Sequence, residues 1–255
     1  MEEMRINKYL SSAGVCSRRQ ADQMIAEGRI TVDGQRACAG MKVTGQEEIC
    51  IDGKLLRNND QPSPVLLAVN KPVGIVCTTS EKDKDNIVDF LHYPVRVYPI
   101  GRLDKASEGL ILMTNQGDLV NKILKGSSHQ EKEYLVRVDK PVNGNFLRAM
   151  REGVPIPDTN RVRHLKDDIR EQEAPVVVTR PCRVRAEGAF EFRIILTQGL
   201  NRQIRRMCEY LGYRVRSLKR IRVMNIKLGD MPPGSCREIT GAELERFMKM
   251  LGAAD

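Results

Sequence analysis

The sequence has 255 residues, which is long enough to bury a proper core. It carries 42 Lys and Arg against 33 Asp and Glu, and this net charge of +9 favours an anionic partner. No apolar run approaches the roughly 18 residues that a membrane span needs. Seven scattered Cys without a Cys-x-x-Cys pair, beside three His, indicate neither a disulfide framework nor a zinc site, and we expect reduced thiols in a cytoplasmic protein.

Residues 1–57 predict a small module of two helices and a few short strands. Apolar residues recur at helical spacing from Ile6 to Ala13, and Gly14 follows as a cap. The segment Ser17-Arg18-Arg19-Gln20 has the pattern of a capping box that opens a second helix. Two Asp-Gly pairs, at 33–34 and 52–53, mark turns between strands.

Arg18 and Arg19 fall in the first turn of that second helix, where the helix dipole does not favour cations. Phosphate groups facing them would compensate, but an ordinary solvated helix start explains them as well. The module holds nine Lys or Arg against eight Asp or Glu, so its cations must cluster on one face if it binds RNA.

A polar, Pro-broken linker is predicted at residues 58–64, followed by a second domain at 65–255. The domain begins with an apolar strand at 65–69 that ends near Lys71-Pro72. A functional role of this Lys-Pro pair and a plain strand-to-turn transition explain the pair equally well. A short helix is predicted at 86–91, and a strand at 95–100 leads into a charged loop.

This loop, Gly101-Arg102-Leu103-Asp104-Lys105, precedes an apolar run at 109–113 that predicts a buried strand. Asp104 lies between two cations, which favour its ionised form. An ionised Asp beside a rigid strand suits a nucleophile. A surface loop with an internal ion pair is the competing interpretation.

Further elements follow the loop. We expect helices at 117–124 and 143–151, a strand at 132–138, and a hairpin of strands at 180–185 and 190–196. The strand at 132–138 alternates, with Tyr134, Val136 and Val138 on one face; Tyr134 alone suits a core aromatic. The charged stretch 158–173 predicts an exposed loop or hairpin.

A basic segment begins near Gln198 and predicts a helix that Gly212 ends. Residues 193–222 hold nine Lys or Arg and one acid, Glu209, which is typical of an RNA-backbone contact, although a solvated face is the alternative. Arg205 adjoins the apolar side of the helix, so its guanidinium could reach a cleft. A last helix is expected after Thr240-Gly241-Ala242-Glu243.

Several of these segments resemble the pseudouridine synthases that modify ribosomal RNA, the branch of small-subunit type A and large-subunit types B, E and F. The resemblance rests on Gly101-Arg102-Leu103-Asp104, Lys132-Glu133-Tyr134 and the run from Gly199 to Met207. Within the branch, Asn86 to Phe90 and Gly117 to Leu124 are most similar to type F. Residues 7–34 resemble the S4 RNA-binding domain.

The resemblance implies an α+β fold: an S4-like domain, then a catalytic domain built on a mixed, largely antiparallel sheet. It implies isomerisation of a uridine flipped out of a 23S ribosomal RNA stem-loop. It requires no cofactor or metal. Transfer RNA is left open as a second substrate, and a monomer is expected. The catalytic residues it implies are Asp104, Tyr134 and Arg205; the RNA contacts are Arg18, Arg19, Lys71, Arg102, Arg202 and Arg206.

Two other classes compete with this interpretation. A non-catalytic RNA-binding protein would need no reactive groups, whereas Asp104, Tyr134 and Arg205 occur together here. A methyltransferase would need a nucleotide-cofactor loop, and the sequence shows no such motif. Whether Asp104 attacks the base or the sugar is left open.

Overall fold

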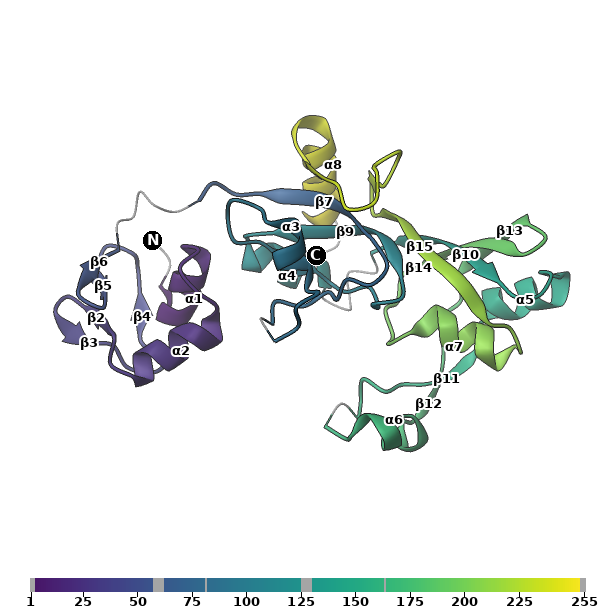
Figure 1. The fold of residues 1–255 in the computed structure, drawn as a ribbon, viewed down its shortest axis with the longest axis horizontal. Helices are drawn as coiled ribbons and strands as arrows, with labels where there is room; N and C mark the ends of the chain where they lie inside the picture. Colours follow the sequence, from purple (N-terminus) through teal and green to yellow (C-terminus); the bar gives the residue numbers. More distant parts are fainter. Residues whose placement is uncertain (1–2, 57–61, 81, 125–129, 163, 253–255) are drawn as a thin grey trace. The chain divides into compact units, whose positions relative to one another are not determined.

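The computed structural model describes residues 3–56, 62–80, 82–124, 130–162 and 164–252 (Figure 1). The predicted linker at 58–64 therefore lies largely outside the described residues. The chain divides into two compact units. The first comprises residues 1–65 with 93–97 and 115–117, and the second comprises the remainder. No helix within the described ranges is long and apolar enough to cross a membrane.

The first unit is built on two helices, α1 (Ile6–Ser12) and α2 (Arg18–Ala26). The predicted capping box is present, because Ser17 and Gln20 exchange side-chain-to-backbone hydrogen bonds. The helices pack on small strands with a core that includes Leu10, Ala21 and Ile30. These strands form a β1–β4 pair and a sheet of order β3-β2-β5-β6: β1 (Met4–Arg5), β2 (Ile30–Val32), β3 (Gln35–Arg36), β4 (Lys42–Val43), β5 (Ile49–Ile51) and β6 (Lys54–Leu55).

The second unit is organised by a nine-stranded sheet in the order β13-β14-β10-β15-β9-β7-β17, with β8 beside β9 and β16 beside β15. Among the described strand pairs only β15 and β9 run parallel, so the sheet is mixed and largely antiparallel, as predicted. The bounds are β7 (Leu66–Lys71), β8 (Tyr98–Ile100), β9 (Glu108–Thr114), β10 (Lys132–Val138), β13 (Arg183–Gly188), β14 (Glu191–Leu196), β15 (Val215–Val223), β16 (Ile226–Lys227) and β17 (Cys236–Glu238).

Helices cover this sheet over two apolar cores. One core lies under α5 (Gly144–Glu152) and α7 (Gln203–Tyr210), where Phe146 packs on Phe192 and Met207 belongs to the same cluster. The other lies under α4 (Gly117–Leu124) and α8 (Gly241–Gly252), where Phe247 packs among residues of β7 and β9.

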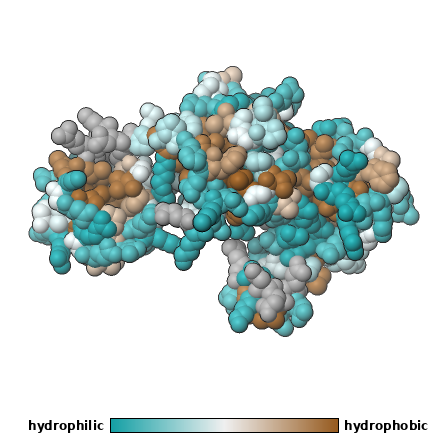
Figure 2. All heavy atoms as spheres, in the orientation of Figure 1, coloured by the Kyte–Doolittle hydropathy of each residue, from teal (hydrophilic) through white to brown (hydrophobic). Residues whose placement is uncertain are grey.

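In the view of Figure 2, hydrophilic side chains cover most of the surface, with smaller hydrophobic patches between them. A short helix, α3 (Ile87–Leu91), begins at the cap residue Asn86.

The parallel contact between β9 and β15 depends on Gly109. Its backbone has φ of +103°, and a Cβ there would lie 2.7 Å from the Arg220 nitrogen. Only glycine tolerates both conditions. Arg220 in turn is buried, and its Nε donates to the Leu110 carbonyl at 2.6 Å. This close approach brings the loop before β9 beside β15.

The stretch 158–173, expected as an exposed loop or hairpin, connects the antiparallel strands of a hairpin and is mostly exposed or half-buried where its burial is described, but it departs from the prediction at two points. Asp158 and Thr159 are buried, and the stretch ends in a helix, α6 (Asp167–Glu173), between the paired strands β11 (Pro155–Pro157) and β12 (Val176–Val178). The buried start was not predicted because Arg206 on α7 donates to Pro157 O and Thr159 Oγ1, both at 3.1 Å. Such a long-range contact leaves no local pattern in the sequence.

Candidate active site

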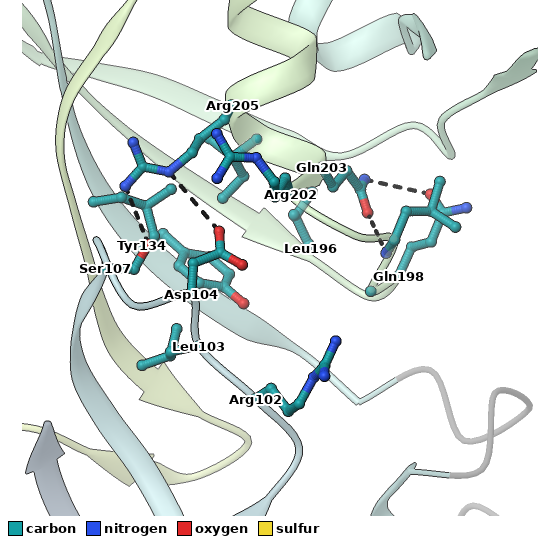
Figure 3. A pocket seen from close by; sticks show the side chains of 14 residues that line it. Arg102, Leu103, Asp104, Ser107, Tyr134, Leu196, Gln198, Arg202, Gln203 and Arg205 are labelled. Carbon is teal, nitrogen blue, oxygen red and sulfur yellow. Dashed lines mark hydrogen bonds and ion pairs between the residues drawn. The ribbon is translucent and has the colours of Figure 1, made fainter. Parts of the chain in front are cut away.

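A cavity in the second unit gathers three residues that the sequence singled out: Asp104, Tyr134 and Arg205. Asp104 comes from the loop before β9, Tyr134 from β10 and Arg205 from α7, so three separate elements build the site. Figure 3 shows Asp104 between Arg205 and Arg202 on one side and Arg102 on the other. Apolar and polar side chains complete the lining of the cavity. They are Leu103, Leu196, Leu218, Ser107, Gln198 and Gln203.

Arg205 connects α7 to the loop that carries Asp104. Its Nη2 donates to Ala106 O at 2.9 Å and to Ser107 Oγ at 3.2 Å, and its Nε lies 3.9 Å from Asp104 Oδ2. That Nε is buried and has no hydrogen-bond partner within the described part of the chain. The guanidinium therefore faces the carboxylate as an ion pair, at a distance longer than a hydrogen bond.

Burial lowers the pKa of the Arg205 guanidinium, and the nearby Asp104 carboxylate acts in the opposite direction. Arginine remains protonated in proteins even so. Asp104 keeps about one third of its side-chain surface exposed, so an incoming ligand can reach it. A partly exposed carboxylate beside a fixed cation is suited to nucleophilic or electrostatic work.

Tyr134 both packs against the core under α7 and lines the cavity. The alternation of β10 explains this position, because Tyr134, Val136 and Val138 share one face of the strand as predicted. Its hydroxyl has no hydrogen-bond partner among the residues that the structure describes. The hydroxyl is thus available to a ligand in the cavity.

A turn after β7 holds the Asp104 loop from its other side, a support that the sequence analysis missed. Leu103 N donates to the Cys77 Sγ at 3.3 Å, and Gly74 N donates to Lys105 O at 2.8 Å. Burial raises the pKa of the Cys77 thiol, so it stays protonated. Only the position of Cys77 shortly after the Lys71-Pro72 pair could have suggested this role.

Two of the predicted RNA contacts are contradicted by burial. Lys71 is fully buried, and its Nζ donates to the carbonyls of Pro72 and Ile75, both at 2.8 Å. Burial also lowers the pKa of Lys71. Arg206 is buried too, with hydrogen bonds to Pro157, Thr159 and Asn201. Both cations serve the fold, since neither can reach a phosphate.

Four other predicted contacts remain accessible. Arg102 and Arg202 are exposed at the cavity, and Arg18 and Arg19 are exposed on α2 of the first unit. Arg202 is the residue before α7 and has a left-handed backbone with φ of +50°. The predicted helix near Gln198 thus begins five residues later, at Gln203, and the segment before it lines the cavity.

The comparisons agree with this architecture. Residues 65–210 match the RNA pseudouridylate synthase family model, and residues 4–49 match the S4 domain. The chain is 48% identical over 247 residues to the dual-specificity RNA pseudouridine synthase RluF of Salmonella typhi, covering 97% of this chain and 79% of that protein. It is 30% identical over 250 residues to the ribosomal large subunit pseudouridine synthase B of Bacillus subtilis, covering 95% of each.

A solved structure provides a further match over nearly the whole length. It is a crystal structure of a pseudouridylate synthase, with a TM-score of 0.64 and 25% sequence identity, covering 95% of this chain and 99% of that one.

Proposed function

The chain belongs to the RNA pseudouridylate synthase family, with an S4 domain at its N-terminal end, and we propose that Asp104, Tyr134 and Arg205 carry its isomerisation reaction. The observation that supports these roles is their convergence from three elements on one cavity. The S4 domain is assigned to residues 1–57, the linker to 58–64 and the catalytic domain to 65–255.

In the proposed reaction the N1–C1′ bond of a uridine breaks, the uracil rotates, and C5 bonds to C1′. The Asp104 carboxylate attacks either the ring or the sugar and is released at the end, so it is regenerated in each turnover. Arg205 balances its charge, because the free Nε faces Oδ2. A preorganised cation in a partly dry site costs no reorganisation during reaction.

Tyr134 is proposed to stack on the uracil and, after the new bond forms, to relay the C5 proton, its hydroxyl passing one proton on as it takes the other, while N1 gains a proton, so that no proton is gained or lost overall. Its ring lines the cavity and its hydroxyl is free of other described partners, which supports both roles. The uracil has to leave its stack to reach Asp104, at a cost of about a few kcal/mol. Arg102, exposed across the cavity from Arg202, is placed to hold the flipped nucleotide or fill the space it leaves.

The proposed substrate is a stem-loop of 23S ribosomal RNA, with transfer RNA as a second candidate, acted on by a cytoplasmic monomer. The names of the relatives support an RNA substrate, since one is a large-subunit synthase and the other has dual specificity. Exposed Arg18, Arg19, Arg102 and Arg202 supply the RNA contacts in this proposal. Mapping of pseudouridines in both RNA classes from cells lacking the gene would separate the two substrates.

Release of tritium from RNA labelled at uracil C5 tests the reaction. The wild type should release tritium, and Asp104→Asn, which keeps the side-chain shape without the charge, should release none while still binding RNA. Comparable release by Asp104→Asn would remove Asp104 as the nucleophile. No release by the wild type from any ribosomal or transfer RNA would favour a non-catalytic RNA-binding protein.

A further inference from the structure

A second cavity lies beside the catalytic cavity, next to α7, and the two share Arg202 and Arg205 in their walls. We call this second cavity the α7 groove. Its charged wall consists of four cations and two carboxylates, all within the second unit: Lys140, Arg202, Arg205, Arg214, Asp139 and Glu209. Because Arg202 and Arg205 belong to both walls, the nucleotides next to one held in the catalytic cavity would lie close to the groove.

The groove has more positive charge than its own carboxylates neutralise. Asp139 accepts a hydrogen bond from the Arg214 backbone nitrogen at 2.7 Å, and this bond is the main cause of its lowered pKa. Lys140 Nζ donates to Gly212 O at 2.6 Å, which satisfies one donor but leaves its charge. Among the described residues, neither Arg202 nor Arg214 forms an ion pair.

Arginines elsewhere in the basic segment are compensated, which makes the groove distinctive. Arg193 and Arg222 both pair with Glu133, at 3.0 and 2.6 Å. Arg206 and Arg220 are buried against backbone carbonyls. The number of cations between residues 193 and 222 is therefore larger than the number whose charge is uncompensated. Arg202 and Arg214 are exposed and line this groove, so part of the uncompensated positive charge lies there.

The groove offers little for base stacking. Its one aromatic residue, Tyr213, is 9% exposed, and its hydroxyl donates to Pro141 O at 3.1 Å. Proteins that read single-stranded bases present aromatic faces, whereas backbone recognition needs only cations and hydrogen-bond donors. The lining of the groove thus suits phosphates better than bases.

We infer that the α7 groove binds the sugar–phosphate backbone of the RNA that flanks the flipped uridine, an inference that rests on the proposed function. The groove contributes affinity and a salt-dependent contact, while the choice of uridine is made elsewhere. Arg214 is the residue that carries the contact beyond the catalytic cavity, because Arg202 and Arg205 line both cavities.

Arg214→Gln tests this inference, with Arg246→Gln as its matched control. Arg246 is exposed on α8 and outside the groove, so the control removes the same charge. We expect Arg214→Gln to reduce the slope of log affinity against log salt by about 0.7 to 0.9, the value of one lost phosphate contact. Fluorescence anisotropy with a labelled stem-loop substrate measures the slope, and an unchanged melting temperature confirms folding.

A methylphosphonate linkage, which is uncharged, locates the contact on the RNA. Placed beside the target uridine, it should weaken binding by the wild type but cause no further loss in Arg214→Gln. Equal slopes for the wild type and Arg214→Gln, or equal losses in Arg214→Gln and Arg246→Gln, would overturn the inference. Tritium release by the wild type in the same experiment would leave the proposed function standing, so the two failures are distinguishable.

Discussion

At the scale of single residues, one arginine makes three contacts with the loop that carries Asp104. Arg205 holds Ala106 and Ser107 by hydrogen bonds and directs its remaining Nε toward Asp104. In the proposed site, positioning and charge compensation come from the same guanidinium, whose planar fork allows several fixed bonds. A lysine could supply the charge at this position but would lose the forked contact with the loop.

Tyr134→Phe separates a catalytic tyrosine from a structural one. The ring is kept, so packing against the core and stacking on uracil should survive. If the hydroxyl accepts the C5 proton, single-turnover tritium release should slow by about 10²- to 10⁴-fold, the usual contribution of a general base. RNA affinity should change little.

The same variant should have nearly wild-type stability, because the hydroxyl has no partner among the described residues and none is lost. Loss of a satisfied buried hydroxyl would instead cost about 1–3 kcal/mol. A melting curve measured beside the kinetics distinguishes the cases. Normal turnover per folded molecule in a destabilised variant would refute the catalytic role.

At the scale of elements, β10 serves two purposes through its alternation. One face carries Tyr134 to the cavity, and the other carries Glu133 to an ion-pair network across β10, β14 and β15. Glu133 is bonded by Arg193 and Arg222, and Glu131 extends the network to Arg183 and again to Arg222. The network therefore helps to fix the strand that presents Tyr134.

Glu133→Gln should destabilise the protein at neutral pH. The Glu133 side chain is only 13% exposed, and the change leaves two arginines without their shared charge, at a cost of about 1–3 kcal/mol. Glu245→Gln on α8, at an exposed position, is the control. Chemical denaturation at pH 7 measures both, and equal stability of the two variants would contradict the role of the network.

The pH dependence of this effect has a defined sign. Burial acts to raise the pKa of Glu133, but hydrogen bonds from Arg222 and Arg193 outweigh it and lower the pKa. A lowered folded-state pKa gives stability that is complete above the unfolded pKa of about 4.3 and is lost as pH falls through the folded value. The difference in stability between wild type and Glu133→Gln should therefore shrink below about pH 4.3. A difference that stays constant down to low pH would show that charge is not its cause.

At the scale of the whole molecule, the sequence predicted most elements, and the structure brings Asp104, Tyr134 and Arg205 to one cavity, but the hydrogen-bond partners of the buried cations were not predicted. The alternation of β10 and the capping box at Ser17 are local patterns, and the structure contains both. Lys71 donates to carbonyls of the turn that directly follows it, whereas Arg206 donates to the carbonyl of Pro157, 49 positions away in the sequence, which no local pattern reveals. The parallel contact at Gly109 was missed for the same reason.

The first unit offers a test of how RNA binding is divided along the chain. Arg18 and Arg19 are exposed in the first turn of α2, where the helix dipole disfavours cations without an anion nearby. The double variant Arg18→Gln/Arg19→Gln should flatten the salt dependence of RNA binding by about 1.4 to 1.8 units of log–log slope if each contacts one phosphate. The control, Arg36→Gln/Lys54→Gln, removes two exposed cations from the sheet of the same unit.

Combining the double variant with Arg214→Gln decides whether one RNA engages both units at once. For a single RNA bound simultaneously, the slope losses should add, since each reports separate phosphates. Linkage also raises the local concentration of the second contact, so the affinity lost by either change should be larger on a long RNA than on a short stem-loop. Losses that are independent of RNA length would show that the first unit does not bind the same molecule that occupies the catalytic cavity. A slope unchanged by Arg18→Gln/Arg19→Gln on the longest RNA would remove these arginines from the RNA interface altogether.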